Sequence, residues 1–364
     1  MKKRSVFDTL LLALSAAILI IGGVGLCAFP APRYSAKENR MLAAIPHFSS
    51  RSLADGSYTA ALEDYASERV PFRGICREVW SSLELAVLHG EAHGVILCRD
   101  GSLCRRITVN ENVFNANINS MARLQKLFPA TPVTVAVAPR RIDMRAEVLP
   151  VLYDTARERA EWKDLGENVL TFEALDTDAC WYRTDHHWSC EGAYLAYTQL
   201  GAALGYTPYP SSDFQVVTVS EGFLGTSANA CGYPHVMPDS IRIWRFEGDD
   251  EYRLIRDGKQ ADFKGFYDLQ KCDTADQYSL FLGGNCGVCE IDLGDNDTRP
   301  LLLLIKDSFA NSLLPFLARH YRILAIDPRY NASGIRSLTE EAEQVLVLCG
   351  MQTLQQTPFL NTLK

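Results

Sequence analysis

Residues 301–326 decide the fold class, and they read LLLLIKDSFANSLLPFLARHYRILAI. Leu301–Ile305 and Arg322–Ile326 are apolar runs of strand length. The segment between them, Ser308–His320, is predicted to be a helix with a kink at Pro315. A strand, a helix and a second strand in this order form the repeating unit of a parallel sheet, and fully apolar strands indicate that both faces are covered. The stretch therefore predicts an α/β fold.

The same alternation of strands and helices extends to both sides of this stretch. The sequence predicts strands at Val133–Ala138, Asn168–Phe172 and Val345–Cys349, and helices at Glu111–Phe128, Glu191–Leu204 and Ser337–Glu343. The pattern predicts a parallel sheet with helices on both faces, whose functional sites lie beyond the carboxyl ends of the strands.

Residues 205–299 have a different character, because they are rich in glycine, aspartate and aromatic residues and contain short β-like pieces. We interpret this part as an inserted β-rich segment that shapes a rim. Its aromatic residues, Tyr233, Trp244 and Tyr252, either stack on sugar rings or pack in the core.

The N-terminus combines a basic cap, Lys2–Arg4, with an uncharged run of 20 residues, Leu10–Phe29. At about 1.5 Å per residue a helix of this length spans roughly 30 Å, one bilayer core. Positive charge before the span keeps the N-terminus in the cytoplasm and places the rest outside. A cleaved signal peptide is the alternative. The sequence predicts an anchor at residues 1–29, a linker at 30–50 and a globular domain at 51–364.

Composition excludes several classes of protein. The chain is 47% hydrophobic and 22% charged, as a globular protein is, so it is neither disordered nor fibrous. Its net charge of -8, from 36 basic and 44 acidic residues, argues against binding to nucleic acids or to an anionic membrane surface.

Cysteines are frequent, with 11 in the chain, of which Cys27 lies in the apolar run and ten lie beyond it. An even number outside the membrane predicts disulfides, although some of the cysteines are expected to be small buried hydrophobic residues instead. Cys98 and Cys104 flank a short turn, which favours a local bridge. Cys286 and Cys289 have the spacing of metal ligands, but no second pair completes a metal site, so we expect a disulfide or a free thiol there.

The string TDHHW, residues 184–188, concentrates groups that move protons or bind metals. One histidine can act as a general base that Asp185 holds in the productive tautomer. Alternatively, Asp185, His186 and His187 bind a metal, but adjacent side chains point in different directions and no further ligand is evident. A third interpretation is structural, with the histidines capping the helix that follows.

The segment KDSFAN, residues 306–311, lies between a strand and a helix. Ser308 in this position stands at the carboxyl edge of the sheet, where backbone N–H groups of the helix start can hold an oxyanion. The amide of Asn311 can donate to the same oxygen. The alternative is that Asp307 or Ser308 only caps the helix. A nucleophilic serine needs a base and the base an orienting acid, and the two segments together supply all three.

Three segments together resemble the DHHW family of bacterial surface proteins: KENRMLAAIP, TDHHW and KDSFANSLLPFLARHY. The residues that carry the resemblance most specifically are Glu38–Arg40, Asp185–Trp188 and Asp307–Phe309. The turn near Gly225–Thr226 resembles the family only in the type of its residues. This family is similar to the SGNH-hydrolase-like proteins of polysaccharide O-acetylation, including the periplasmic alginate acetylation proteins. The resemblance covers most of the chain after the apolar run.

The resemblance implies a flavodoxin-like SGNH fold with a Ser-His-Asp triad in permuted order, the Asp-x-His pair first and the serine late. Mapped by motif, Ser308 would be the nucleophile, His187 the base and Asp185 its orienting acid. The spacing is one residue shorter than the Asp-x-x-His of ordinary SGNH hydrolases, so His186 remains an alternative base.

The resemblance leaves the oxyanion hole less defined, because Cys349–Gln352 stands where ordinary members carry a Gly-x-Asn-Asp block. Contacts to the oxyanion or the substrate are expected from Asn311, Phe309 and Arg329. No cofactor and no metal is expected.

The resemblance implies an enzyme of acetyl-ester chemistry, held at the cell membrane by its N-terminal helix with the globular domain outside. Its expected partners are a cell-surface polysaccharide and an acetyl donor, supplied through a multi-spanning membrane acyltransferase. We expect an O-acetyltransferase. The alternatives are a carbohydrate esterase or deacetylase, and a non-catalytic glycan-binding protein of the same fold; a secreted protein is the alternative to an anchored one.

Overall fold

The structure is a computed structural model, and it describes residues 6–28, 33–35, 37–38, 40–70, 72–88, 90–150, 162–166, 168–172, 174–331 and 342–362. The chain divides into two compact units. The first comprises Met1–Leu83 with Gly232–Pro234, and the second comprises Glu84–Cys231 with His235–Lys364.

The first unit consists of helices and a pair of two-residue strands. They are α1 (Val6–Ala28), β1 (Tyr34–Ser35), β2 (Arg40–Met41), α2 (Ser50–Ala54), α3 (Ser57–Ser67) and the start of α4 (Arg73–Val87). The ion pairs explain part of the ENR motif: Glu38 pairs with Arg40 and with Arg73, and Arg40 also reaches Glu68. The charged residues of this motif therefore hold the β1–β2 segment to the helices that follow it.

Helix α1 coincides with the apolar run from which the sequence predicts an anchor. Among the residues whose backbone and side chain are both described, no uninterrupted helix is long and apolar enough to cross a membrane. The single-pass anchor thus gains no support from the structure and stays a prediction from the sequence.

The second unit is built on a mixed sheet, in which the described residues form eight strands. Their order is β11 (Lys259–Gln260), β10 (Arg253–Arg256), β12 (Val288–Asp292), β14 (Arg322–Ile326), β13 (Leu301–Lys306), β15 (Gln344–Gly350), β6 (Val133–Ala138) and β7 (Val169–Thr171). The strands from β14 to β7 run parallel, as the apolar runs predict. Strands β12, β10 and β11 are antiparallel.

Two smaller sheets and several helices complete this unit. The sheets contain β3 (Glu91–Ala92), β4 (Val95–Leu97) and β5 (Leu103–Arg105), and β8 (Gln215–Phe223) with β9 (Asp239–Arg245). The α-helices are α5 (Glu111–Leu127), α6 (Arg141–Met144), α8 (Cys190–Leu204), α9 (Thr226–Cys231), α10 (Leu314–Leu317) and α11 (Met351–Gln356). The 3-10 helices are η1 (Ala146–Val148), η2 (Asp178–Cys180), η3 (Ser211–Asp213), η4 (Leu269–Asp273), η5 (Gln277–Leu280), η6 (Ser308–Ser312) and η8 (Leu360–Thr362).

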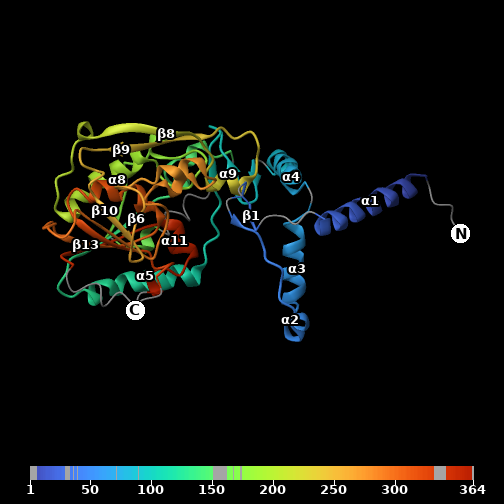
Figure 1. The fold of residues 1–364 in the computed structure, drawn as a ribbon, viewed down its shortest axis with the longest axis horizontal. Coiled ribbons are helices and arrows are strands. Elements are labelled where there is room, and N and C mark those ends of the chain that lie inside the picture. Colours follow the sequence, from blue (N-terminus) through green and yellow to red (C-terminus); the bar gives the residue numbers. More distant parts are fainter. Residues whose placement is uncertain are drawn as a thin grey trace. The chain divides into compact units, whose positions relative to one another are not determined.

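Helices cover both faces of the central sheet, as predicted, and α5 and α8 lie on opposite sides of it (Figure 1). Side chains alternate along each strand, so Leu302 and Leu304 pack in the core that contains α8, whereas Leu303 and Ile305 pack in the core that contains α5. This alternation explains why the run Leu301–Ile305 of β13 is apolar throughout.

One expectation about this unit is not confirmed and another is wrong. The structure does not confirm residues 205–299 as a separate insertion, since strands β10, β11 and β12 of this segment extend the central sheet. Few positions of these strands are buried, which masks them in the sequence. The helix expected at Ser308–His320 is instead the 3-10 helix η6 followed by the short α10. Pro315 does not kink a helix but begins one, since the first turn needs no N–H from it.

Several smaller expectations have clear outcomes. The helices at Glu111–Phe128 and Glu191–Leu204 are confirmed as α5 and α8. The helix expected at Ser337–Glu343 lies outside the described residues up to position 341. Trp244 and Tyr252 are buried, which places them in the core rather than on a sugar-binding surface.

The predicted disulfides are absent from the described part of the chain, where none of ten cysteines is in a disulfide bond. Most of these thiols are buried in apolar surroundings, as small hydrophobic side chains are. In two places thiols lie against each other: Cys98 contacts Cys104, and Cys286 contacts Cys289.

Candidate active site

The turn that carries Ser308 follows the carboxyl end of β13 and is held by the side chain of Asp307. Asp307 Oδ1 accepts a hydrogen bond from the backbone N–H of Phe309 at 2.9 Å, as an N-cap does. Its Oδ2 accepts from the N–H of Gly350 at 2.8 Å and from Thr353 Oγ1 at 2.6 Å. Asp307 thus fastens the serine turn to the end of the neighbouring strand β15, and the capping role weighed for it from the sequence is present.

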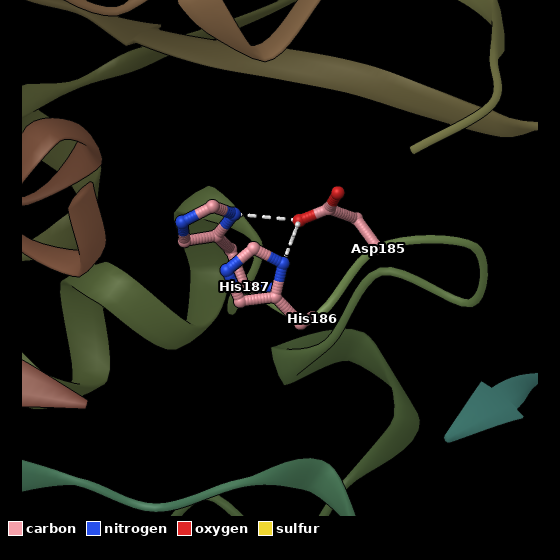
Figure 2. A group of neighbouring side chains, drawn as sticks. All are labelled: Asp185, His186 and His187. Carbon is pink, nitrogen blue, oxygen red and sulfur yellow. Dashed lines mark hydrogen bonds and ion pairs between the residues drawn. The ribbon is translucent and has the colours of Figure 1, made fainter. Parts of the chain in front are cut away.

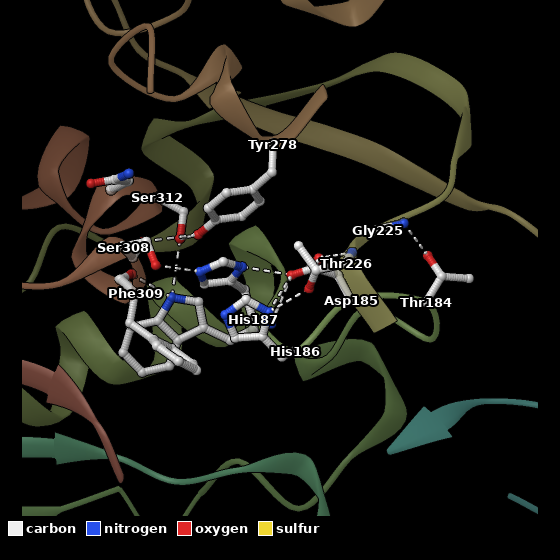
Figure 3. A network of polar contacts seen from close by, with 12 residues as sticks. Thr184, Asp185, His186, His187, Gly225, Thr226, Tyr278, Ser308, Phe309 and Ser312 are labelled. Carbon is white, nitrogen blue, oxygen red and sulfur yellow. Dashed lines mark hydrogen bonds and ion pairs between the residues drawn. The ribbon is translucent and has the colours of Figure 1, made fainter. Parts of the chain in front are cut away.

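His187 connects Ser308 to Asp185 (Figure 3). Its Nε2 lies 2.8 Å from Ser308 Oγ, and its Nδ1 lies 2.6 Å from Asp185 Oδ1. An ionised carboxylate only accepts hydrogen bonds, so we assign the ring proton to Nδ1. Nε2 then presents a lone pair to the serine hydroxyl. This arrangement has the geometry that a Ser-His-Asp proton relay requires.

The carboxylate of Asp185 is fully enclosed, with an exposed fraction of 1%. Besides the ring of His187 it accepts the backbone N–H of His187 at 3.0 Å, the N–H of Thr226 at 2.6 Å and the hydroxyl of Thr226 at 2.9 Å. Burial by itself raises the pKa of Asp185. The electrostatic interaction with the His186 and His187 rings and these hydrogen bonds outweigh burial, and the pKa of Asp185 lies well below its usual range.

The loop that supports Asp185 requires a glycine. A Cβ on Gly225 would lie 2.3 Å from Asp185 Cβ, closer than any real contact. Because Gly225 leaves this space open, Thr226 can bring both its N–H and its hydroxyl to the carboxylate.

Two aromatic residues fix the serine and the base against each other. The ring of Tyr278 stacks on His187 with centroids 3.9 Å apart and planes 5° from parallel, and its hydroxyl donates to the carbonyl of Ser308 at 3.3 Å. The indole N–H of Trp188 donates to the carbonyl of Phe309 at 2.9 Å and also lies 3.0 Å from Ser312 Oγ. The tryptophan of the TDHHW string therefore ties this loop to the serine turn.

His186, the alternative base, does not reach Ser308 by any hydrogen bond among the described residues. Its Nδ1 lies 2.7 Å from Thr226 Oγ1, and its ring lies against that of His187. Burial and the neighbouring His187 lower the pKa of His186 to about 3, so the ring is neutral at physiological pH.

Asp185, His186 and His187 also form the one cluster of metal-binding residue types in the described part of the chain (Figure 2). Both rings turn one nitrogen toward Asp185 Oδ1, at 3.5 Å for His186 and 2.6 Å for His187. The short contact from His187 is a hydrogen bond in which a proton occupies the space between the two groups. The donor set therefore fits a proton relay better than a metal site.

The residues expected to contact the oxyanion or substrate differ in their availability. Asn311 is committed to its neighbours, because its Oδ1 accepts from buried Lys306 at 2.6 Å and its Nδ2 donates to Asn285 at 3.0 Å. Arg329 is paired with Asp327. The backbone N–H of Ser308 itself has no acceptor among the described residues, and this N–H can stabilise an oxyanion.

Phe309 packs beside the relay, with its ring centroid 5.0 Å from that of His187. A small pocket next to the relay is lined by Phe309, His186, Asp185, Arg105, Arg140 and Gln352. Ser308 is 9% exposed, so the hydroxyl is enclosed but not sealed off.

Three residues that support the site were not predicted to do so from the sequence: Thr226, Tyr278 and, through its indole, Trp188. Thr226 had a signal, since the Gly225–Thr226 turn matches the family in character. Tyr278 had none, because a tyrosine in a 3-10 turn 30 residues before Ser308 carries no mark of its position.

Comparisons with known proteins agree with this fold. A DHHW family protein from Eubacterium siraeum has 20% identity to the chain and a TM-score of 0.62, and the match covers 75% of this chain and 95% of that one. The structure of Bacillus cereus PatB1 with a sulfonyl adduct has 17% identity and a TM-score of 0.59, covering 74% and 98%. The O-acetyltransferase domain of Pseudomonas putida AlgJ is more distant, with 14% identity, a TM-score of 0.43 and coverage of 74% and 95%.

At these identities the likeness of the first two structures shows a shared fold. A comparison with curated protein sequences gives no match. The family model described as DHHW protein matches residues 170–326, which include both the TDHHW string and the serine turn. The resemblance to the DHHW family inferred from the sequence is thereby confirmed over residues 170–326.

Proposed function

We propose that the protein is a serine-dependent acetyl-ester enzyme that acts on a cell-surface polysaccharide outside the cytoplasm, as an O-acetyltransferase. The observation that carries the proposal is the relay from Ser308 through His187 to Asp185, with 2.8 Å and 2.6 Å between successive atoms. Buried serines that only cap a helix do not need a histidine held in one tautomer by a carboxylate.

In the first step, His187 Nε2 takes the proton of Ser308 as Oγ attacks the carbonyl carbon of an acetyl ester or thioester. The negative charge that develops on the carbonyl oxygen is stabilised by the backbone N–H of Ser308, for which the described residues offer no acceptor. The bond to the donor then breaks, and the leaving group takes the proton from His187. Asp185 stabilises the imidazolium in between, which its own low pKa allows.

In the second step, an acceptor hydroxyl attacks the acetyl group on Ser308 and gives its proton to His187. The serine ester bond breaks, and His187 returns the proton to Ser308. With a sugar hydroxyl the protein is a transferase, and with water it is an esterase or deacetylase. The family resemblance of the sequence favours transfer.

The proposal extends to location and partners. The N-terminal apolar run would hold the domain at the outer side of the cell membrane, and a multi-spanning acyltransferase would supply the acetyl group. The basic residues before the run and the resemblance support this arrangement.

The test of the proposed chemistry is turnover of 4-nitrophenyl acetate by the full chain. Ser308→Ala and His187→Ala are expected to lose at least a hundredfold in rate, since each removes one member of the relay. Ser102→Ala is the matched control, because this buried hydroxyl is hydrogen-bonded to Asp100 and not to a member of the relay.

Turnover that survives in Ser308→Ala contradicts the serine mechanism. Folded wild-type protein that neither turns over the ester nor reacts with a fluorophosphonate supports the alternative, a non-catalytic glycan-binding protein.

A further inference from the structure

The hydrogen bonds around His186 determine which of its nitrogens carries the proton. Thr226 Oγ1 lies 2.9 Å from the carboxylate of Asp185, which only accepts, so the hydroxyl proton of Thr226 points there. The oxygen of Thr226 must then accept from His186 Nδ1, 2.7 Å away. Asp185 Oδ1 lies 3.5 Å from the same Nδ1 and favours a proton on it. We therefore assign the proton of His186 to Nδ1, which leaves Nε2 as a hydrogen-bond acceptor.

This acceptor is unused by the protein. Nε2 of His186 has no hydrogen-bond partner among the described residues. It is also absent from the set of buried polar atoms that lack a partner, so it is accessible to solvent. The side chain of His186 is 27% exposed and lines the small pocket beside Phe309. The pocket borders Asp185 and Phe309 and holds about 20 Å³, which is room for one hydroxyl group, so the open nitrogen is available to a hydroxyl of a substrate.

The two imidazoles lie side by side. Their centroids are 3.8 Å apart with planes tilted by 39°. Figure 2 shows that each ring turns one nitrogen toward Asp185 and the other nitrogen away from it on the same side. The lone pair of His186 therefore faces the same region as the lone pair of His187, displaced by about the thickness of one ring.

We propose that His186 Nε2 accepts a hydrogen bond from a second hydroxyl of the sugar, adjacent to the hydroxyl that receives the acetyl group. The inference rests on the proposed function and adds a substrate class to it, a sugar unit with vicinal hydroxyls. One hydroxyl lies against His187 and its neighbour against His186, in keeping with the offset of the two rings.

In the transfer step the acetyl group passes from Ser308 Oγ to the sugar oxygen. The ester bond to the serine breaks, a new ester bond to the sugar forms, and the proton of the attacking sugar hydroxyl goes to His187 Nε2 and on to Ser308. The second hydroxyl keeps its proton and only donates a hydrogen bond to His186. His186 is thus a binding and positioning residue, and it fixes which hydroxyl approaches the acetyl carbon.

Two substitutions separate this role from structural support. In His186→Asn the side-chain amide can replace Nδ1 and donate to Thr226, but nothing replaces Nε2. In His186→Gln the amide oxygen can replace Nε2 as acceptor, whereas the bond to Thr226 is lost. The two variants therefore each keep one of the two contacts of the histidine.

The experiment uses the full chain with 4-nitrophenyl acetate as donor and two probe acceptors, cyclohexane-1,2-diol and cyclohexane-1,4-diol. The diols have equal numbers of hydroxyls, and only the first has them adjacent. Acetylated diol and free acetate are measured by mass spectrometry as a ratio of transfer to hydrolysis. We expect the wild type to favour the 1,2-diol by about three- to tenfold, the range that one hydrogen bond provides.

His186→Asn is expected to lose this preference, and His186→Gln to keep most of it. The opposite order of the two variants means that His186 acts through Thr226 and overturns the inference. If ester turnover depends on Ser308 but the two diols are acetylated equally, or neither is acetylated, the inference is overturned and the proposed function stays in place. Absence of any Ser308-dependent turnover contradicts both the inference and the proposed function.

Discussion

Replacing Asp185 with asparagine removes the charge from the relay at constant shape. The carboxylate accepts four hydrogen bonds, from the ring and backbone of His187 and from the backbone and hydroxyl of Thr226. An amide has one oxygen and one NH₂ group. If the NH₂ group takes the place of Oδ1, it faces the backbone N–H of His187. If it takes the place of Oδ2, it faces the backbone N–H of Thr226.

Either orientation of the amide leaves one buried backbone N–H without an acceptor, which costs about 1–3 kcal/mol of stability. The first orientation also reverses the tautomer of His187, because the ring must then accept at Nδ1 and carry its proton at Nε2. A protonated Nε2 cannot take the proton of Ser308. The corresponding change in serine protease triads lowers the rate by about 10⁴-fold, equivalent to about 5.4 kcal/mol of activation free energy.

The assay is the second-order rate of fluorophosphonate labelling at Ser308, measured together with thermal unfolding. Asp239→Asn is the matched control, since this carboxylate is also buried and accepts the backbone N–H groups of Arg183 and Thr184 but does not contact His187. We expect similar losses of stability in the two variants and a loss of labelling of several thousandfold only in Asp185→Asn. Labelling of folded Asp185→Asn within tenfold of the wild type would refute the reasoning.

Three further predictions follow from contacts around the relay. Gly225→Ala is expected to reduce ester turnover as severely as loss of Asp185, because the new Cβ would lie 2.3 Å from Asp185 Cβ. Gly222→Ala is the control, since its Cβ would have no atom within 4 Å, and it is expected to leave turnover unchanged. Equal turnover of the two variants would contradict the importance of this close approach. Trp188→Phe removes the indole N–H donated to Phe309, and it is expected to lower the free energy of unfolding in urea by about 1–3 kcal/mol and to slow turnover. Trp181→Phe removes an N–H donated to Leu175, and it is expected to lower stability without slowing turnover. Equal turnover rates of the two variants would show that the hydrogen bond from Trp188 to the serine turn is not needed for activity. Burial lowers the pKa of His186 to about 3 and of His320 to about 4, so both rings stay neutral in the folded protein while the unfolded chain takes up their protons near pH 6.5. The free energy of unfolding should therefore fall between pH 7 and pH 5, by about 2 kcal/mol per histidine, and His320→Gln should abolish one such contribution; identical pH slopes for the wild type and this variant would contradict the assignment.

The sequence predicts the parallel part of the sheet well, because buried strands with helices on both faces are apolar at every position. Leu301–Ile305 and Val345–Cys349 were recognisable for this reason. Strands β10 and β12 were not, since an edge of the sheet with mixed burial leaves no continuous apolar run. The break between η6 and α10 was hidden as well, because apolar residues fill both the 3-10 turn and the helix.

The relay was predictable from two motifs, but its supports were not. Ser308, His187 and Asp185 lie together as the TDHHW and DSF strings indicate. The choice between His186 and His187 needed the backbone, since adjacent side chains leave a loop in different directions. Asn311 illustrates the converse, because nothing in the sequence showed that Lys306 and Asn285 would occupy its amide.

The most direct test of the account is peptide mapping by mass spectrometry after the full chain has reacted with an aryl sulfonyl fluoride. PatB1, which shares the fold, has been observed with a sulfonyl adduct, which motivates the reagent. The account predicts a single sulfonyl group on Ser308, formed at least a hundredfold more slowly in His187→Ala. A folded protein that stays unmodified at Ser308, or reacts there equally fast without His187, would contradict the central claim.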